Sequence, residues 1–256
     1  MSAPLAQPGT AGDQAIDYFS KGHPLRAWAT QRAVRARLRM LDQFAARVPF
    51  DRTSAVIDIG ITPDAELADS NIFERWYPHP ERITATSVED ASAIERRYPG
   101  VRFVQTDGER LPFSDRSFDV SFCSAVLEHV GGPEAQRRFV TEMVRVSDRF
   151  FLTTPNRWFP LELHTFLPLV HWLPRGAHRW LLRRLGLRFW ADPANLNLVS
   201  ASQLRAMFPP EVHVMIVRNR TLGLCSNLIA VGHRRASHRE SPTGPEPAVR
   251  SGHESA

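Results

Sequence analysis

The stretch VIDIGITPD (56–64) begins as a nucleotide-binding turn does, with a β-branched apolar run, the acid Asp58 and then Gly60. A glycine at this point lets the backbone approach a cofactor, and the acid orders the turn. Thr62 and Asp64 stand where a G-x-G-x-G loop has its second and third glycines. A nicotinamide-dependent oxidoreductase is therefore disfavoured, because it needs a glycine-rich loop that cradles phosphate. Ordinary turn chemistry at a strand end is the alternative interpretation of Asp58 and Gly60.

Histidine and glutamate occur together in two further motifs, LEHV (127–130) and PLELHT (160–165). His129, and His164 with Glu162, are candidate general bases, because the pKa of histidine lies near working pH. Such a base suits a hydroxyl acceptor, whereas a carboxylate acceptor needs none. The alternatives are a structural hydrogen bond of His129 at a helix start and simple packing of His164.

Alternating strand-like and helical segments must position these residues. Helical spacing occurs at 28–48, 65–77, 90–100, 133–146 and 200–208. Strand-like runs occur at 54–60, 82–87, 101–105, 117–125, 149–154, 212–218 and 226–232. This alternation predicts an α/β, Rossmann-like, doubly wound sheet of seven strands. The last two strands are too close in sequence for a crossover helix, so the sheet should be mostly parallel with an antiparallel last strand.

Residues 156–199 interrupt the alternation directly after the fifth strand and are rich in Trp, Phe, Leu, His and Arg. We expect a helical insertion that forms an acceptor lid over the carboxyl edge of the sheet, where open α/β sheets bind ligands. Within it, 175–188 carries five arginines and no acid beside an apolar side. A basic amphipathic helix of this kind can rest on a membrane surface or grip a phosphorylated or lipid-linked acceptor. A solvated cationic face over a core stripe is the alternative.

The bulk composition is that of a globular protein, with 256 residues, 43% hydrophobic residues and a formal net charge of +5. Two cysteines, Cys123 and Cys225, exclude a disulfide framework and a zinc cluster, and we expect buried thiols in a reducing compartment. Neither a secretory signal nor a membrane-spanning run is evident, and nothing resembles an RNA-binding module. We therefore expect a cytoplasmic protein that binds no nucleic acid, with disordered segments at 1–14 and 234–256 around one domain at 15–233.

The stretch DGERLPFSDRSFDVSFCSAVLEHV (107–130) resembles the centre of the class I S-adenosylmethionine (SAM)-dependent methyltransferases of the type 11 group. TTPNRWFPLELHTFLPLVHWLP (153–174) is similar to a subset of that group with an insertion after strand five. The resemblance extends over about residues 50–233. It implies a methyltransferase that uses SAM as its cofactor.

The resemblance also implies roles for single residues. Asp107 would accept from the adenine amino group, and Gly108 would let a backbone amide approach the ring. Leu111, with Phe113, would wall the adenine pocket. Ser124 would sit beside the methionine part of SAM. Asp58 and Gly60 match the start of the first motif of the family, where the acid also orders the amine of SAM.

The chain departs from the family at the end of the second strand. An acid that binds both ribose hydroxyls is usual there, and Ser87 occupies the place. A serine makes a weaker contact than a bidentate carboxylate, and Glu89 and Asp90 follow closely enough to act in its stead. A divalent metal held by the Glu-His motifs is not expected, because Ala125 lacks a carboxylate that one metal-binding group carries.

These observations predict a SAM-dependent methyltransferase that methylates a small-molecule, lipid-linked or glycan-type acceptor at oxygen. Peripheral contact with the inner membrane face through 175–188 is part of this prediction. The alternative is a catalytically inactive protein of the same fold that acts as a binding or regulatory partner, which Ser87 and the altered first motif favour.

Overall fold

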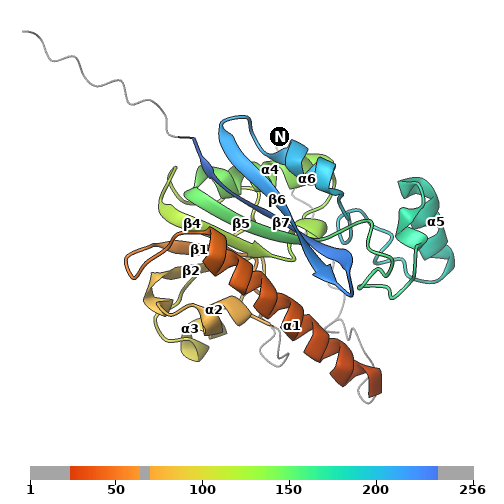
Figure 1. Cartoon of the computed structure of the whole chain (residues 1–256), viewed down its shortest axis with the longest axis horizontal. Helices are drawn as coiled ribbons and strands as arrows, with labels where there is room; N and C mark the ends of the chain where they lie inside the picture. Colours follow the sequence, from red (N-terminus) through yellow and green to blue (C-terminus); the bar gives the residue numbers. More distant parts are fainter. Residues whose placement is uncertain (1–23, 64–69, 236–256) are drawn as a thin grey trace, which may run out of the picture.

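The chain folds into one seven-stranded sheet with helices on both faces (Figure 1). The computed structural model describes residues 24–63 and 70–235. The expected disordered segments lie outside these residues, except that Arg234 belongs to the last strand. The strands are β1 (Val56–Ile59), β2 (Ile83–Ser87), β3 (Arg102–Gln105), β4 (Phe118–Ser124), β5 (Ser147–Pro155), β6 (Val212–Thr221) and β7 (Leu224–Arg234).

The strand order is β3-β2-β1-β4-β5-β7-β6. Neighbours from β3 to β5 are parallel, whereas β7 is antiparallel to both β5 and β6. The predicted mostly parallel sheet with an antiparallel last strand is therefore confirmed. The order of the strands reverses between β1 and β4, since β2 and β3 lie on one side and β4 and β5 on the other. The carboxyl ends of the strands at such a switch point form the crevice in which open α/β sheets bind ligands.

Helices cover both faces of the sheet (Figure 1). Residues of α1, α2 and α3 pack in one buried cluster, and residues of α4 and α6 pack in another on the opposite face. The insertion carries α5. The helices are α1 (Pro24–Arg47), α2 (Ile72–Trp76), α3 (Ala93–Arg97), α4 (Pro133–Arg145), α5 (Arg175–Arg184) and α6 (Ala201–Met207), and the short 3₁₀ turns are η1 (Pro80–Arg82), η2 (Leu127–His129) and η3 (Val170–Trp172).

Local sequence explains why these elements form. Consecutive residues of β1 bury opposite faces, with Val56 in the α1 cluster and Ile57 in the α4 cluster, so both faces of the strand are apolar. The side chain of Ser200 accepts from the Gln203 amide while the Gln203 side chain accepts from the Ser200 amide, which caps α6. The β6–β7 hairpin turns at Leu222 and Gly223, both at positive φ, as a tight two-residue turn requires.

The helix expected at 65–77 differs from the observed structure. Only α2 is helical within the described part of that range, and 64–69 lies outside the described residues. Asn71 precedes α2 in a left-handed conformation, where its side chain donates to the Thr62 carbonyl and accepts from the Thr62 amide. This amide pair ties the start of α2 to the first turn after β1.

The insertion after β5 has a small core of its own. Leu182 of α5 packs there with Trp190, Ala191, Leu196 and Leu198. In Figure 1 α5 stands away from the sheet, beyond the ends of β6 and β7. The expected helical character is confirmed for α5 and η3, while most of the remaining insertion is irregular. No helix within 24–63 and 70–235 is long and apolar enough to cross a membrane.

Candidate active site

The turn after β1 packs against both β2 and the turn after β4. The amides of Gly60 and Ile61 both donate to the carbonyl of Thr86 on β2, at 2.8 and 2.9 Å. Gly60 has φ of +95°, and a Cβ there would collide with the side chain of Val126. Gly60 therefore packs directly against the turn after β4 at the switch point, and both its conformation and its packing require glycine.

Two carboxyl groups are buried together beneath this turn. Asp58 on β1 is 6% exposed and Glu74 on α2 is 3% exposed. Burial raises the pKa of Asp58 well above its usual range, and the neighbouring Glu74 raises it further. The proton that the raised pKa keeps on Asp58 lies between the two groups, because the Asp58 carboxyl donates to the Glu74 carboxylate. A buried acid pair of this kind favours a cationic partner. The sequence analysis missed Glu74, whose signal was an acid between Phe73 and Arg75 on a short apolar helix.

Ser87 lies at the end of β2 and is buried, while Glu89 and Asp90 are exposed. The Ser87 hydroxyl oxygen accepts the Glu89 amide at 3.2 Å, which leaves its proton to donate to a ligand oxygen. Asp90 accepts from the Ser92 amide, so that carboxylate is committed to the start of α3. Of the two acids that follow Ser87, Glu89 is therefore the one whose carboxylate makes no such hydrogen bond and can reach toward the expected ribose position.

The loop after β3 contains Asp107 and Gly108. One carboxylate oxygen of Asp107 accepts from the amides of Glu109 and Arg110, at 3.2 and 2.9 Å, so the acid shapes its own turn. Its second oxygen has no partner among the described residues and can accept from a ligand amine. A Cβ at Gly108 would collide with the Phe139 ring, so packing of this loop on α4 also requires glycine.

Leu111 is 3% exposed and belongs to the sheet core, so it supports the site from beneath. Arg145 of α4 anchors this loop, because its guanidinium donates to the carbonyls of Leu111 and Phe113 at 3.0 and 2.8 Å. The same guanidinium pairs with Glu142, which in turn accepts the Leu111 amide. The sequence analysis missed this anchor; its signal was the Glu-x-x-Arg spacing on the helix, which places both side chains on one face.

Hydroxyl groups line the carboxyl ends of β4 and β5. Ser124 shares a hydrogen bond of 3.1 Å with Thr153, and Thr154 donates to Glu128 Oε2 at 3.0 Å. Glu128 is 1% exposed, and its second oxygen has no partner among the described residues. A buried carboxylate with one unused oxygen therefore stands next to the switch point.

The insertion contributes Glu162 and His164. The Glu162 carboxylate accepts from the ring Nδ1 and amide of His164, at 2.6 and 2.9 Å, and from the amide and hydroxyl of Thr165. Burial raises the pKa of Glu162, but these donors outweigh it and hold the pKa at about 2. Burial lowers the pKa of His164, yet the Glu162 bond and charge, with that of Glu128, raise it above its usual value.

His129 and His164 come together although 35 positions separate them in the sequence (164 − 129). Their ring centroids are 5.0 Å apart, and Trp190 lies 5.1 Å from His164. His129 donates from Nδ1 to the Asn195 carbonyl at 2.7 Å. Both rings therefore use Nδ1 for these hydrogen bonds, and Nε2 takes no part in them.

Potential ligand atoms of Glu128, His129 and His164 all lie within 4.8 Å of one another. Two supported imidazoles and one carboxylate form a set that can bind a divalent cation. The same atoms can instead bind and deprotonate a hydroxyl group.

The site has features that fit SAM. The buried Asp58–Glu74 pair favours a cation such as the methionine amine, and Asp107 offers an oxygen to the adenine amine. Ser87 can donate to a ribose oxygen. Ser87 ends β2 and Asp107 follows β3, whereas Asp58 lies within β1 and Glu74 on α2.

A profile of the methyltransferase domain family matches residues 74–149. A ubiquinone biosynthesis O-methyltransferase of Parvibaculum lavamentivorans is 34% identical over 86 residues, which are 32% of this chain and 33% of that protein. A namesake from Coxiella burnetii (strain RSA 331) is 26% identical over 110 residues, 41% of this chain and 47% of that protein. The chain thus spans between a third and a half of the length of these curated relatives.

Solved structures share the whole fold. The magnesium protoporphyrin IX methyltransferase of Synechocystis has a TM-score of 0.53 at 12% identity, covering 85% of this chain and 91% of that one. A Haloferax volcanii complex of the Trm112 activator with a putative methyltransferase gives a TM-score of 0.53 at 15% identity, covering 84% and 97%. Residues 74–149 are therefore similar to the methyltransferase domain family, and the chain shares its fold with these solved methyltransferase structures.

Proposed function

We propose that this protein transfers a methyl group from SAM to a hydroxyl oxygen of a small-molecule acceptor. The observation that carries the proposal is the Glu162–His164 pair, 2.6 Å apart, which leaves His164 Nε2 uncommitted beside the carboxyl ends of β4 and β5. The O-methyltransferase names of the relatives support oxygen as the target. Bound SAM supplies a methyl group activated by a sulfonium.

The residues of the chain divide the remaining tasks. Asp107 would bind the adenine amine, Ser87 with Glu89 would bind the ribose, and the Asp58–Glu74 pair would face the methionine amine. Ser124 would line the methionine side. Holding the donor still and excluding water contribute much of the rate enhancement of a group transfer.

His164 would remove the acceptor proton. Neutral His164 carries its proton on Nδ1, where Glu162 accepts it, so the lone pair of Nε2 points away from Glu162 and can take the hydroxyl proton. Glu162 then stabilises the imidazolium. The ring centroid of His129 lies 5.0 Å from that of His164, so His129 would bind the same acceptor hydroxyl or the proton that this hydroxyl loses.

Calorimetry with S-adenosylhomocysteine tests cofactor binding, with Asp107→Ala as the weakened variant. A SAH-release assay with small phenols and lipid-linked hydroxyl compounds then compares wild type with His164→Gln. We expect a loss of about 10²–10⁴-fold for His164→Gln, the range of a general base. His213→Gln, an exposed histidine of β6, is the control and should keep full activity. Wild-type turnover in His164→Gln would contradict the role of His164.

The inactive alternative has one observation in its favour, which is that Ser87 stands where a bidentate acid is usual. It predicts that SAH stabilises neither the wild-type protein nor Asp107→Ala, although both fold. Binding to the wild type alone contradicts it.

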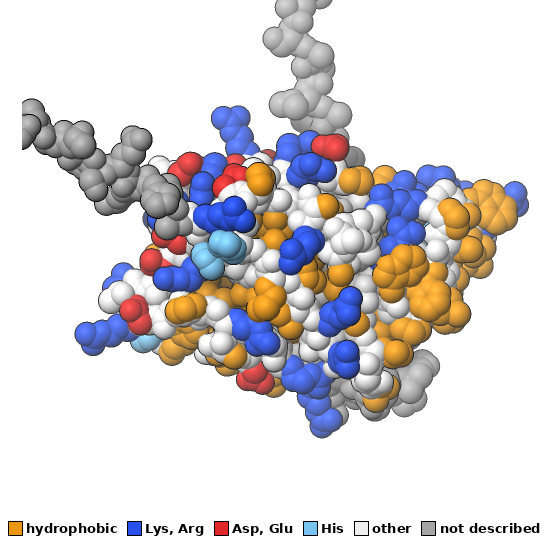
Figure 2. Space-filling view, turned by 45° about the horizontal axis from the view of Figure 1, so that its top comes forward, with side chains coloured by type: hydrophobic (Ala, Val, Ile, Leu, Met, Phe, Trp, Pro, Cys, Tyr) orange, Lys and Arg blue, Asp and Glu red, His pale blue; other side chains and the backbone are white. Residues whose placement is uncertain are grey.

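We further propose that the insertion contacts the membrane surface. Large apolar side chains are exposed over it, among them Trp180 at 56%. Figure 2 shows these side chains gathered with arginines at the end of the molecule that carries α5. The exposed apolar residues of this insertion surface are Trp158, Leu163, Phe166, Leu169, Trp172, Leu173, Trp180, Leu185 and Phe189.

Aromatic and basic side chains together are typical of interfacial membrane contacts. Co-sedimentation with vesicles of phosphatidylglycerol and phosphatidylcholine tests this. We expect binding that weakens in the Trp172→Ser, Trp180→Ser variant and persists in Met215→Ser, an exposed apolar residue of β6. Equal binding of all three proteins would contradict the proposal.

A further inference from the structure

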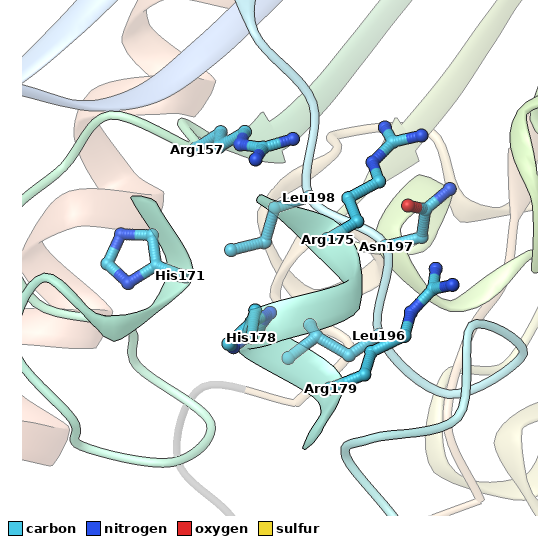
Figure 3. Close-up of a pocket in the computed structure, with 8 residues that line it drawn as sticks. All are labelled: Arg157, His171, Arg175, His178, Arg179, Leu196, Asn197 and Leu198. Atoms are coloured by element: carbon cyan, nitrogen blue, oxygen red, sulfur yellow. The ribbon is translucent and has the colours of Figure 1, made fainter. Parts of the chain in front are cut away.

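A second polar cavity lies inside the insertion, away from the strand ends (Figure 3). Its interior of about 20 Å³ is roughly the size of one water molecule, so it can enclose one oxygen of a ligand group whose other atoms remain outside it. Arginine and histidine dominate its wall, and no acidic side chain lines it. The lining residues that carry the argument are Arg157, His171, Arg175, His178, Arg179 and Asn197.

Helix α5 presents a cationic face to this cavity. Arg175, His178 and Arg179 are spaced i, i+3 and i+4, which places them on one side of the helix. Figure 3 shows the guanidinium groups of Arg175 and Arg179 extending to the side of α5 on which Asn197 lies. All three side chains of α5 are half-buried, so their charges are only partly solvated. Burial lowers the pKa of Arg175, and nearby Arg157 lowers it further.

Several polar atoms at the cavity are buried without partners. Arg157 Nε, which is a donor, and His178 Nε2 have no hydrogen-bond partner among the described residues. His171 is 3% exposed and donates Nε2–H to the Phe159 carbonyl, while its Nδ1, an acceptor in the neutral ring, has no described partner. Leaving buried polar atoms unpaired costs free energy, so a ligand or a water that bonds them is favoured there.

The start of α5 adds to the positive field. The first amides of a helix have no carbonyl partner within the helix, and the first turn of α5 contains Arg175 and no acid. A cation at a helix N-terminus opposes the helix dipole, whereas an anion there is stabilised. Three arginines therefore line one cavity that has no carboxylate in its wall, although the charge of Glu162 acts on His178 from nearby.

We propose that this cavity binds a phosphate group, with Arg157, Arg175 and Arg179 as its ligands. Planar guanidinium groups match the oxygens of a phosphate in bidentate geometry. The Asn197 amide donates to the Glu128 carbonyl at 2.7 Å, so the cavity wall continues into the turn that carries Glu128 and His129. A phosphate held there would anchor a phosphorylated acceptor beside the candidate base. That role rests on the proposed function, whereas phosphate binding itself does not.

Isothermal calorimetry with inorganic phosphate, at ionic strength matched by sodium chloride, tests the site. We expect binding to the full-length protein that weakens at least tenfold in the Arg175→Gln, Arg179→Gln variant. Arg183→Gln removes a charge from an exposed position of the same helix, outside the cavity, and should bind as wild type does. Equal affinity in wild type and the double variant overturns the proposal, as does an equal loss in Arg183→Gln, which would indicate general charge attraction.

Two further measurements identify the source of the phosphate. Glycerol 3-phosphate represents a soluble phosphomonoester, and vesicles of phosphatidate in phosphatidylcholine represent a lipid headgroup. If the Arg175→Gln, Arg179→Gln variant binds either probe more weakly than wild type does, the site is supported and that probe identifies the class of phosphate. If the variant binds both probes as wild type does, the proposal is overturned. SAH binding is measured on the same proteins. Phosphate binding without SAH binding would contradict the proposed function, whereas the phosphate site would still be supported.

Discussion

Glu162 and His164 form a hydrogen bond of 2.6 Å between Oε1 and Nδ1, within a loop that delivers the imidazole to the carboxyl edge of the sheet. Only Leu163 separates the two partners in the sequence, but the surrounding residues determine how the pair behaves. His164 lies against His129 and Trp190, and the charge of Glu128 adds to that of Glu162 in raising its pKa. A general base with this support titrates above its usual value and stays oriented.

The pH dependence of turnover should reveal this pair. His164 must be neutral to act as a base, so the rate should rise with pH through a pKa above 6.5. Glu162→Gln removes the charge that stabilises the imidazolium, so we expect the acid limb of the pH–rate profile to move to lower pH and the maximal rate to fall.

The same pair should make stability depend on pH with a definite sign. The raised His164 pKa gives stability that is full below about 6.5 and is lost as pH rises through the folded pKa. The lowered Glu162 pKa gives stability that is full above about 4.5 and is lost as pH falls toward about 2. Urea unfolding at pH 5 and 9 should show Glu162→Gln more harmful at pH 5. Equal losses at both values would contradict the pairing.

Asp58→Asn should separate stability from cofactor binding. The pKa of Asp58 is raised by burial and by Glu74, so the folded wild type binds a proton that the unfolded chain releases above about 3.8. Wild-type stability therefore falls as pH rises above that value, and the asparagine removes this fall. We expect unfolding free energies to favour the variant more at pH 8 than at pH 5, while calorimetry shows weaker SAH binding.

Asp42→Asn, an exposed change on α1, provides the control for this experiment. It should alter neither the pH dependence of unfolding nor SAH affinity. A pH-independent effect of Asp58→Asn would mean that the carboxyl pair is not the source of the shift.

Gly60→Ala should destabilise the protein by about 2–4 kcal/mol, since it combines a positive φ with a collision against Val126. Gly186→Ala is a matched control, because Gly186 also has a positive φ, of +80°, but no atom lies near its Cβ position. That variant should lose only about 1 kcal/mol. Denaturant unfolding measures both, and similar losses would show that packing on Val126 is unimportant.

Arg145→Met should loosen the loop that carries Leu111 and Phe113. Its guanidinium bonds the two carbonyls and Glu142, so we expect a loss of about 2–3 kcal/mol in unfolding free energy and weaker SAH binding. Arg137→Met changes an exposed position of the same helix and should leave both unaltered. If SAH affinity is unaffected in Arg145→Met, the anchor supports the fold but not the site.

Local patterns determined much of the fold. The β-branched runs, the capped helices and the short connection between β6 and β7 predict the element order and the antiparallel last strand, because periodicity and turn chemistry act over a few residues. The 65–77 range was predicted helical, and in its described part, 70–77, α2 begins at Ile72, because Asn71 pairs with the Thr62 backbone in a left-handed conformation.

The sequence by itself also indicated which residue types could act: the acids after the strands, the two histidines and the arginine-rich helix. Only the tertiary structure decided their partners. It buried Glu74 against Asp58, joined Arg145 to the loop of Leu111, and brought His129 to His164. It also placed Arg157 beside Arg175 at one cavity. These pairings join segments that are far apart in the sequence. They depend on how side chains pack, and such packing produces no repeating pattern of residue types from which the partners could be predicted.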